Sequence, residues 1–126
     1  MTPGATFDAG GLIGLDRNER RIVVLLARAA DTGARITIPA TALAQAIRQP
    51  ERQARLARLI RQPTTDVVEL DRVDATNVGR LLAASGTSDI VDAHVVICAR
   101  RRGQSIVTSD PQDLARLDPA VHLITV

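Results

Sequence analysis

The chain is short of aromatic residues, lysine and cysteine, and each shortage excludes a class of function. Phe7 is the one aromatic residue among 126, which excludes base stacking on aromatic side chains as a way to bind nucleic acid. All 16 basic residues are arginine, so a P-loop lysine and lysine-based nucleophilic catalysis are also excluded. If the chain binds a nucleic acid, it must do so through the phosphates.

The single cysteine and the modest net charge bear on the cellular compartment and on the binding partners. Cys98 has no second cysteine to pair with and lies in an apolar run, which fits a reducing compartment. No apolar run approaches the length that spans a membrane, so we expect a cytoplasmic protein that does not bind membranes. The net charge of +2 permits nucleic-acid binding without requiring it. The length of 126 residues suits a single domain over residues 1–126.

Short apolar runs alternate with longer amphipathic segments, which is typical of a parallel sheet with helices on both faces. In this α/β prediction Pro39 occupies the first position of a helix, where its missing N–H costs nothing. The predicted strands are 5–8, 35–38, 66–70, 105–108 and 121–126. The predicted helices are short ones from Gly11 and at 111–117, and longer ones at 19–30, 39–48, 51–61, 74–84 and 89–102.

Aspartates stand where the predicted strands end or a helix begins. Asp8 closes the first apolar run and Asp110 the fourth, while Asp89 and Asp92 lie three apart at a helix start. Groups just past the carboxyl ends of parallel strands converge on one crevice. Carboxylates gathered there repel one another unless a hard divalent cation lies between them. The pattern therefore predicts a metal-dependent enzyme that acts on a phosphate-containing substrate, and phosphodiester hydrolysis suits it.

Each of these residues also has a purely structural interpretation. Asp8, Asp89 and Asp110 are all placed to cap a helix, and acids in a first turn favour the helix dipole. Three distant positions expected at the same sheet edge favour function over capping. Thr108 and Ser109 serve equally well as ligands for water or phosphate and as turn residues. For His94 and His122, a core or surface role is favoured over catalysis.

Three segments, taken in order and spacing, resemble the PIN-domain ribonucleases, and most of all the VapC-type toxins of bacterial toxin–antitoxin pairs. They are Thr6–Ile13, Thr87–His94 and Ile106–Pro111. The resemblance covers essentially the whole chain. It implies a three-layer α/β/α sandwich with a mostly parallel central sheet of four to five strands. It also implies a Mg²⁺- or Mn²⁺-dependent endoribonuclease, often a homodimer, that a cognate antitoxin protein neutralises.

The resemblance assigns roles to individual residues. Asp8, Asp92 and Asp110 match the catalytic, metal-binding aspartates, with Asp89 as an additional metal ligand and Asp113 in support of Asp110. The remaining supporting positions are Thr108, Ser109 and Gln45.

Gln45 departs from the pattern, because the family usually has a glutamate in this helix and a glutamine brings no negative charge. Glu19 or Glu51 is a possible substitute. The alternative function is therefore a catalytically weakened or inactive PIN-fold interaction module.

The densest basic stretch has three interpretations, which stay open at this point. Its arginines are spaced to lie on the exposed side of a helix, and a solvated face is the plainest explanation. Contacts to RNA phosphates or to an acidic antitoxin segment are the functional ones, with Arg48, Arg52 and Arg55 as candidates. The stretch continues with Arg58 and Arg61.

Two other enzyme classes are disfavoured. Ala9, Gly11 and Gly14 nearly match a dinucleotide-binding fingerprint, but the first glycine is missing and the preceding Asp8 would repel a pyrophosphate. A phosphotransfer enzyme with Asp8 as nucleophile lacks a nearby lysine and a second aspartate two residues on.

Overall fold

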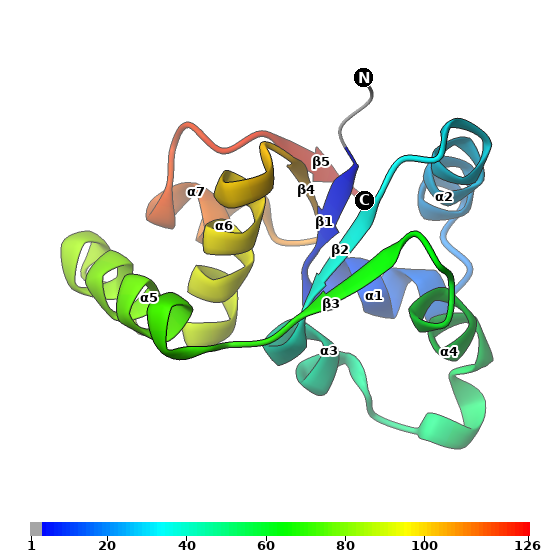
Figure 1. Ribbon diagram of the computed structural model, residues 1–126, viewed down its shortest axis with the longest axis horizontal. Coiled ribbons are helices and arrows are strands. Elements are labelled where there is room, and N and C mark those ends of the chain that lie inside the picture. Colours follow the sequence, from blue (N-terminus) through cyan, green and yellow to red (C-terminus); the bar gives the residue numbers. More distant parts are fainter. Residues whose placement is uncertain (1–3) are drawn as a thin grey trace.

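A parallel sheet of five strands forms the middle of the computed structural model, which describes residues 4–126 (Figure 1). The strands lie in the order β3-β2-β1-β4-β5, and every neighbouring pair is parallel. The α/β class and the mostly parallel sheet of four to five strands are therefore confirmed. The strands are β1 (Ala5–Phe7), β2 (Ile36–Pro39), β3 (Thr65–Val68), β4 (Ser105–Thr108) and β5 (Leu123–Thr125).

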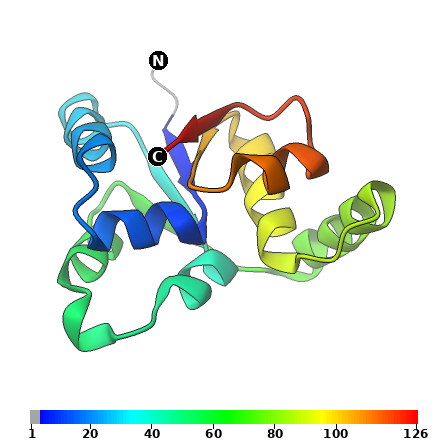
Figure 2. The same ribbon diagram turned by 180° about the vertical axis from the view of Figure 1, so that it is seen from behind.

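Helices cover both faces of this sheet, as Figures 1 and 2 show from opposite sides. Helices α5, α6 and α7 lie over one face, while α1, α2 and α4 lie over the other, which gives the expected three layers. Helix α3 packs between α1 and α6 at the lower end of the sheet in Figure 1. The helices are α1 (Ala9–Asp16), α2 (Arg20–Thr32), α3 (Ala40–Ala46), α4 (Ala54–Ile60), α5 (Arg72–Ser85), α6 (Ile90–Arg102) and α7 (Pro111–Leu117), with a 3₁₀ turn η1 (Pro50–Arg52).

The strands carry apolar side chains to both faces, as burial between two helical layers requires. Neighbours in β4 point to opposite sides, so Val107 joins the core under α1 and Ile106 joins the core under α6. Phe7, the single aromatic residue, is fully buried in the first of these cores. Aliphatic side chains therefore supply nearly all of the packing.

Helix α6 is buried beside the sheet over two turns, because every residue from Ala93 to Ala99 is buried. It packs on the sheet, on α5 and on α7. Even so, no single helix within residues 4–126 is long and apolar enough to cross a membrane. Helices α5 and α6 reach that length and hydropathy only as a pair, and they are bent by 110°.

Two predicted helix boundaries are wrong because distant contacts decide them. Pro39 is the last residue of β2, paired with Val68, and has extended angles (φ −60°, ψ 133°) instead of opening a helix. The proline ring fixes only φ, at a value that helix and extended backbone share, and pairing with β3 selects ψ.

The predicted helix 51–61 is interrupted at Gln53. The Gln53 side chain accepts the N–H groups of Arg48 and Gln49 and donates to Asp16 and to the Ala46 carbonyl. These bonds hold the backbone of Gln53 outside helical geometry (φ −109°, ψ 49°), so η1 and α4 form separately. The same contacts explain why the helix predicted at 39–48 already ends at Ala46.

Candidate active site

The strand order reverses at β1 and β4, and we call the region beyond the carboxyl ends of these two strands the crevice. From β1 the chain builds outward to β2 and β3 on one side, and later to β4 and β5 on the other. Ligands of open parallel sheets bind at the carboxyl ends of the strands that flank such a switch point. Asp8 follows β1 directly and Asp110 lies just beyond β4. The Asp8 N–H also donates to the Val107 carbonyl at 3.2 Å, which ties the two strand ends together.

Asp8 is buried in this crevice and caps α1. Its Oδ1 accepts the Gly11 N–H at 2.7 Å, and the residue is only 5% exposed. Gly11 permits a close approach of α1 to β4, because a Cβ there would lie 2.7 Å from the Val107 carbonyl oxygen. Burial raises the pKa of Asp8, and the nearby Asp110 charge adds to this, while hydrogen bonds from Thr108, Gly11 and Gly10 lower it.

Asp92 is the acid of the crevice whose pKa is most clearly raised. It lies in the first turn of α6, where its N–H donates to the capping Asp89 carboxylate at 3.0 Å. Partial burial and then repulsion from other carboxylates raise the pKa of Asp92 to about 7. The repelling groups are Asp89, Asp8, Asp113 and Asp110, in decreasing order. Five acids from three separate parts of the chain therefore act on one another.

Asp110 precedes α7 but leaves its carboxyl group free of capping. Its side chain makes no cap hydrogen bond, and its N–H donates to Thr108 Oγ1 at 2.8 Å. A hydrogen bond shared with the Asp113 carboxyl raises the pKa of Asp110, with smaller effects from desolvation and repulsion. Ser109 lies against Gly10, where an added Cβ would collide with the Ser109 hydroxyl. Gly10 thus leaves room for a hydroxyl group beside the Asp8 carboxylate.

The acids of the crevice are not neutralised by arginine. Within residues 4–126, Asp113 is the one member of the group in an ion pair, a loose one to Arg116 at 3.7 Å. The other ion pairs of the described chain are Arg35–Asp66, Arg100–Asp118 and Arg101–Asp74. An uncompensated set of carboxylate oxygens fits a hard divalent cation such as Mg²⁺ or Mn²⁺.

The other predicted site residues are exposed on the surface of the molecule. Gln45 lies on α3 with an exposed side chain, and Glu19 and Glu51 are exposed at the starts of α2 and η1. A supporting role for Gln45 stays a prediction. Arg48, Arg52 and Arg55 are exposed as expected, although a break at Gln53 separates them and they do not share one helix.

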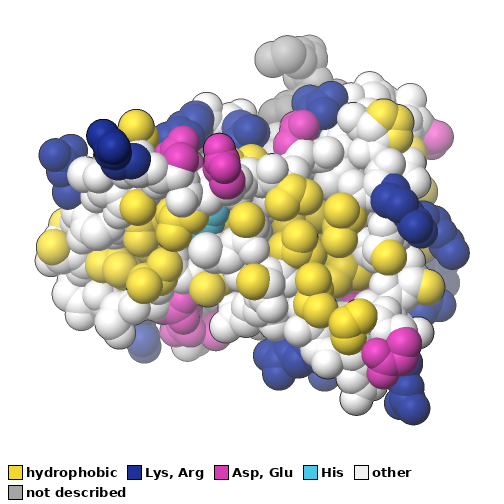
Figure 3. All heavy atoms as spheres, turned by 60° about the horizontal axis from the view of Figure 1, so that its bottom comes forward, with side chains coloured by type: hydrophobic (Ala, Val, Ile, Leu, Met, Phe, Trp, Pro, Cys, Tyr) yellow, Lys and Arg dark blue, Asp and Glu magenta, His cyan; other side chains and the backbone are white. Residues whose placement is uncertain are grey.

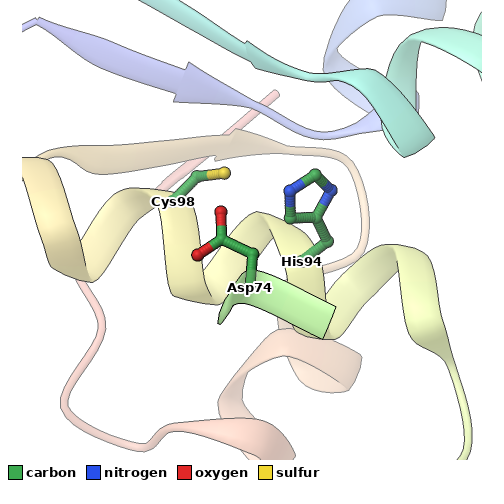
Figure 4. A group of neighbouring side chains, drawn as sticks. All are labelled: Asp74, His94 and Cys98. Atoms are coloured by element: carbon green, nitrogen blue, oxygen red, sulfur yellow. The ribbon is translucent and has the colours of Figure 1, made fainter. Parts of the chain in front are cut away.

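Sequence reasoning missed a second cluster of side chains, between α5 and α6. Asp74, His94 and Cys98 are all buried and lie close together (Figure 4). The core position favoured for His94 is what the structure shows. The spacing of four residues between His94 and Cys98 on one helix was the available signal. Asp74 could not be linked to them without knowing how α5 packs.

Comparisons with known proteins extend over nearly the whole chain. Residues 9–119 match the family model described as PIN domain. Among solved structures, a chain of VapBC2 from Rickettsia felis, bound to a DNA fragment from their promoter, is similar with a TM-score of 0.67. The two chains are 13% identical, and the match covers 96% of this chain and 97% of that one. This likeness shows a shared fold. No curated protein matches the sequence.

Proposed function

This chain belongs to the PIN domain family, and we propose that it is a Mg²⁺- or Mn²⁺-dependent endoribonuclease, the toxin of a cytoplasmic toxin–antitoxin pair. One observation carries the proposal. Five aspartates converge at the switch point of the sheet, and their repulsion helps to raise the pKa of Asp92 to about 7. Such a concentration of negative charge is costly unless a cation binds there, which makes it typical of a functional site.

The side chains of the crevice would have different roles in binding an ion. Asp8, Asp92 and Asp110 would hold the ion, with Asp89 as a further ligand. When bound, the ion would supply the positive charge that activates water and offsets the charge that develops on the phosphate. The Asp8 carboxylate accepts hydrogen bonds from Gly11 and Thr108, and its two oxygens have further lone pairs for an ion. Thr108 accepts the Asp110 N–H and hydrogen-bonds to Asp8, so it orients both acids.

RNA would be bound by arginine instead of by aromatic stacking. Figure 3 turns the lower end of the molecule in Figure 1 toward the viewer and shows basic side chains around the margins of this face, with hydrophobic side chains toward its middle. The basic groups are all arginine because the chain has no lysine. Guanidinium groups at the margin suit a backbone that passes over the face, since each can hold a phosphate with two hydrogen bonds.

A groove between α2 and α4 suits the antitoxin. It encloses about 530 Å³, with Val23, Leu26 and Leu59 on its apolar side and Arg55 and Arg58 beside them. An amphipathic segment with acidic residues fits this combination, since its apolar side chains would be buried and its acids would meet the arginines. This supports the antitoxin interpretation for Arg55, whose guanidinium in the free chain makes only a long hydrogen bond of 3.4 Å to the Asp16 carbonyl.

An RNA-cleavage assay with Asp8→Asn tests the proposal. Asparagine can still accept the Gly11 N–H and cap α1, so the variant removes the charge and keeps the helix start. We expect Mg²⁺- or Mn²⁺-dependent cleavage to fall by about 100-fold or more and growth inhibition to disappear. Asp71→Asn is the matched control, because Asp71 caps α5 in the same way, by accepting the Asp74 N–H at 2.8 Å, and lies outside the acidic group. Undiminished cleavage by Asp8→Asn would overturn the proposal.

Gln45 favours a second candidate, a PIN-fold module that binds partners without cleaving RNA. A neutral amide would lower the affinity for a cation relative to a glutamate at this position. Calorimetry with Mn²⁺ separates the two functions, because the interaction module should show no binding that depends on Asp8, Asp92 and Asp110. If the enzyme is instead active but weakened, Gln45→Glu should tighten Mn²⁺ binding and raise the cleavage rate.

A further inference from the structure

Three potential metal ligands of different chemistry meet between α5 and α6. They are a carboxylate oxygen of Asp74, a ring nitrogen of His94 and the thiol sulfur of Cys98, and these atoms lie within 4.8 Å of one another. Asp74 is 1% exposed, and the other two residues are fully buried. Within residues 4–126, no other group of three His, Cys, Asp or Glu residues is this compact.

The local structure explains why the three side chains face one space. His94 and Cys98 are four residues apart on α6, so they project from the same side of the helix one turn apart. Asp74 comes from the first turn of α5, where its N–H donates to the capping Asp71 carboxylate at 2.8 Å. Figure 4 shows the Asp74 carboxylate and the Cys98 sulfur directed into the same gap, with the His94 ring beside them.

His94 supplies an independent sign that this space can take a ligand. Its Nδ1 is hydrogen-bonded to Thr41 Oγ1 at 2.7 Å, whereas its buried Nε2 has no hydrogen-bond partner among residues 4–126. If Nδ1 carries the ring proton and donates it to Thr41, Nε2 presents a bare lone pair. A histidine that ligates a metal usually has this arrangement, with the second nitrogen held by an outer hydrogen bond. With the proton on Nδ1, the hydrogen bond to Thr41 would hold His94 ready to bind an ion through Nε2.

We propose that Asp74, His94 and Cys98 form a binding site for Zn²⁺ that is separate from the acidic crevice. A nitrogen, a sulfur and an oxygen ligand suit this borderline-soft ion, while the all-oxygen crevice suits Mg²⁺ or Mn²⁺. Binding forms a bond between Cys98 Sγ and Zn²⁺ and releases the thiol proton to solvent. The Cys98 thiolate and the Asp74 carboxylate then carry two negative charges against the two of the ion, His94 is neutral, and the half-exposed Arg101 adds one positive charge beside Asp74.

Arg101 completes the site from outside. Its guanidinium donates to both oxygens of Asp74, and its side chain is 46% exposed. It therefore orients the carboxylate as an outer partner, in the way that second groups commonly orient metal ligands.

Titration of the full chain with Co²⁺ tests this site through a signal that depends on sulfur. After treatment with a chelator, one equivalent of Co²⁺ should produce a thiolate-to-cobalt charge-transfer band in the near ultraviolet, and one equivalent of Zn²⁺ should abolish it. Mg²⁺ should leave the band unchanged. Since Cys98 is the single cysteine, the band can arise from no other residue. Absence of the band in the wild-type chain would overturn the proposal, whatever the fate of any variant.

Variants identify the ligands and separate this site from the acidic crevice. We expect Cys98→Ser to abolish the band, and His94→Gln to weaken Zn²⁺ binding by about 100-fold. Asp92→Asn, which alters the crevice but not this cluster, should keep the band and bind Zn²⁺ within about threefold of the wild type. A band that persists in Cys98→Ser, or one lost in Asp92→Asn, would contradict the assignment. Because RNA cleavage is not measured, the outcome does not depend on the proposed function.

Discussion

At the scale of single residues, an aspartate can cap a helix and also belong to the acidic group. Asp8 and Asp89 both accept a backbone N–H at a helix start, yet both belong to the group of acids that raises the pKa of Asp92. A carboxylate has two oxygens and several lone pairs, so one oxygen can cap a helix while the other stays available. From the sequence alone, each aspartate could be assigned either to helix capping or to an acidic site. Only the three-dimensional convergence shows which aspartates repel one another.

Asp92 gives a prediction about stability in the absence of metal. Its pKa rises from 3.8 to about 7 on folding, so the folded chain binds this proton more tightly than the unfolded chain does. The resulting stabilisation is complete below about pH 4 and is lost as the pH rises through 7. Asparagine cannot ionise, so metal-free Asp92→Asn should be more stable than the wild type at pH 8. Allowing for solvent screening, we expect about 1 kcal/mol, or roughly 3–5 °C in Tm.

Thermal unfolding between pH 4 and pH 8 with a chelator present would measure this effect. Asp66→Asn is the control of opposite sign, because Arg35 lowers the pKa of the Asp66 carboxyl. The ionised Asp66 carboxylate stabilises the folded state above its unfolded pKa, and this stabilisation is lost as the pH falls. The Asp66→Asn variant should therefore be slightly less stable than the wild type at neutral pH. An Asp92→Asn variant that is less stable than the wild type at pH 8 would contradict the electrostatic account of the crevice.

At the scale of helices and strands, the sequence predicted those helix ends that depend on local residues such as glycine. Gly33, Gly86 and Gly103 end α2, α5 and α6 with positive φ, a conformation that glycine adopts without strain, and the predicted ends lie within three residues of these glycines. The predictions failed at Pro39 and Gln53, where pairing with a distant strand or hydrogen bonds to other segments select the backbone angles. Element order was therefore readable from sequence, but boundaries set by tertiary contacts were not.

The attachment of α5 to α6 gives a prediction at the same scale. Arg101 of α6 pairs with Asp74 of α5, and the Asp74 side chain is 1% exposed. Arg101→Met would leave a buried carboxylate without its counter-charge, at a cost of about 3 kcal/mol in the free energy of unfolding. The control is Arg35→Met, because the Arg35 and Asp66 side chains are 52% and 34% exposed. That pair should contribute at most about 1 kcal/mol. Urea unfolding of zinc-free protein measures both, and equal losses would contradict the prediction.

At the scale of the whole molecule, α6 contributes side chains to two groups of different chemistry. Asp92 starts α6 in the acidic crevice, and His94, two residues later, turns into the cluster with Asp74 and Cys98. The crevice was predictable because the carboxyl ends of parallel strands meet whatever the helices do. The second cluster was not, because it depends on how α5 crosses α6. That residues 1–126 form a single domain stays a prediction.

Binding of an ion to the acidic crevice should stabilise the whole molecule, and in a manner that depends on pH. A ligand present at 100 times its Kd stabilises the folded state by about 2.7 kcal/mol, which corresponds to a rise in Tm of roughly 8–12 °C for a chain of this size. Protons compete with the ion for Asp92, whose pKa is about 7, so the shift caused by Mn²⁺ should be large at pH 8 and small at pH 5.5. Thermal unfolding with and without Mn²⁺ at both pH values measures this shift in Tm.

Asp92→Asn should lose most of the shift at pH 8. Asp118→Asn, which alters an ion pair with Arg100 outside the group of five acids, should retain it. A shift that is equal at the two pH values, or unchanged in Asp92→Asn, would show that Mn²⁺ binds elsewhere.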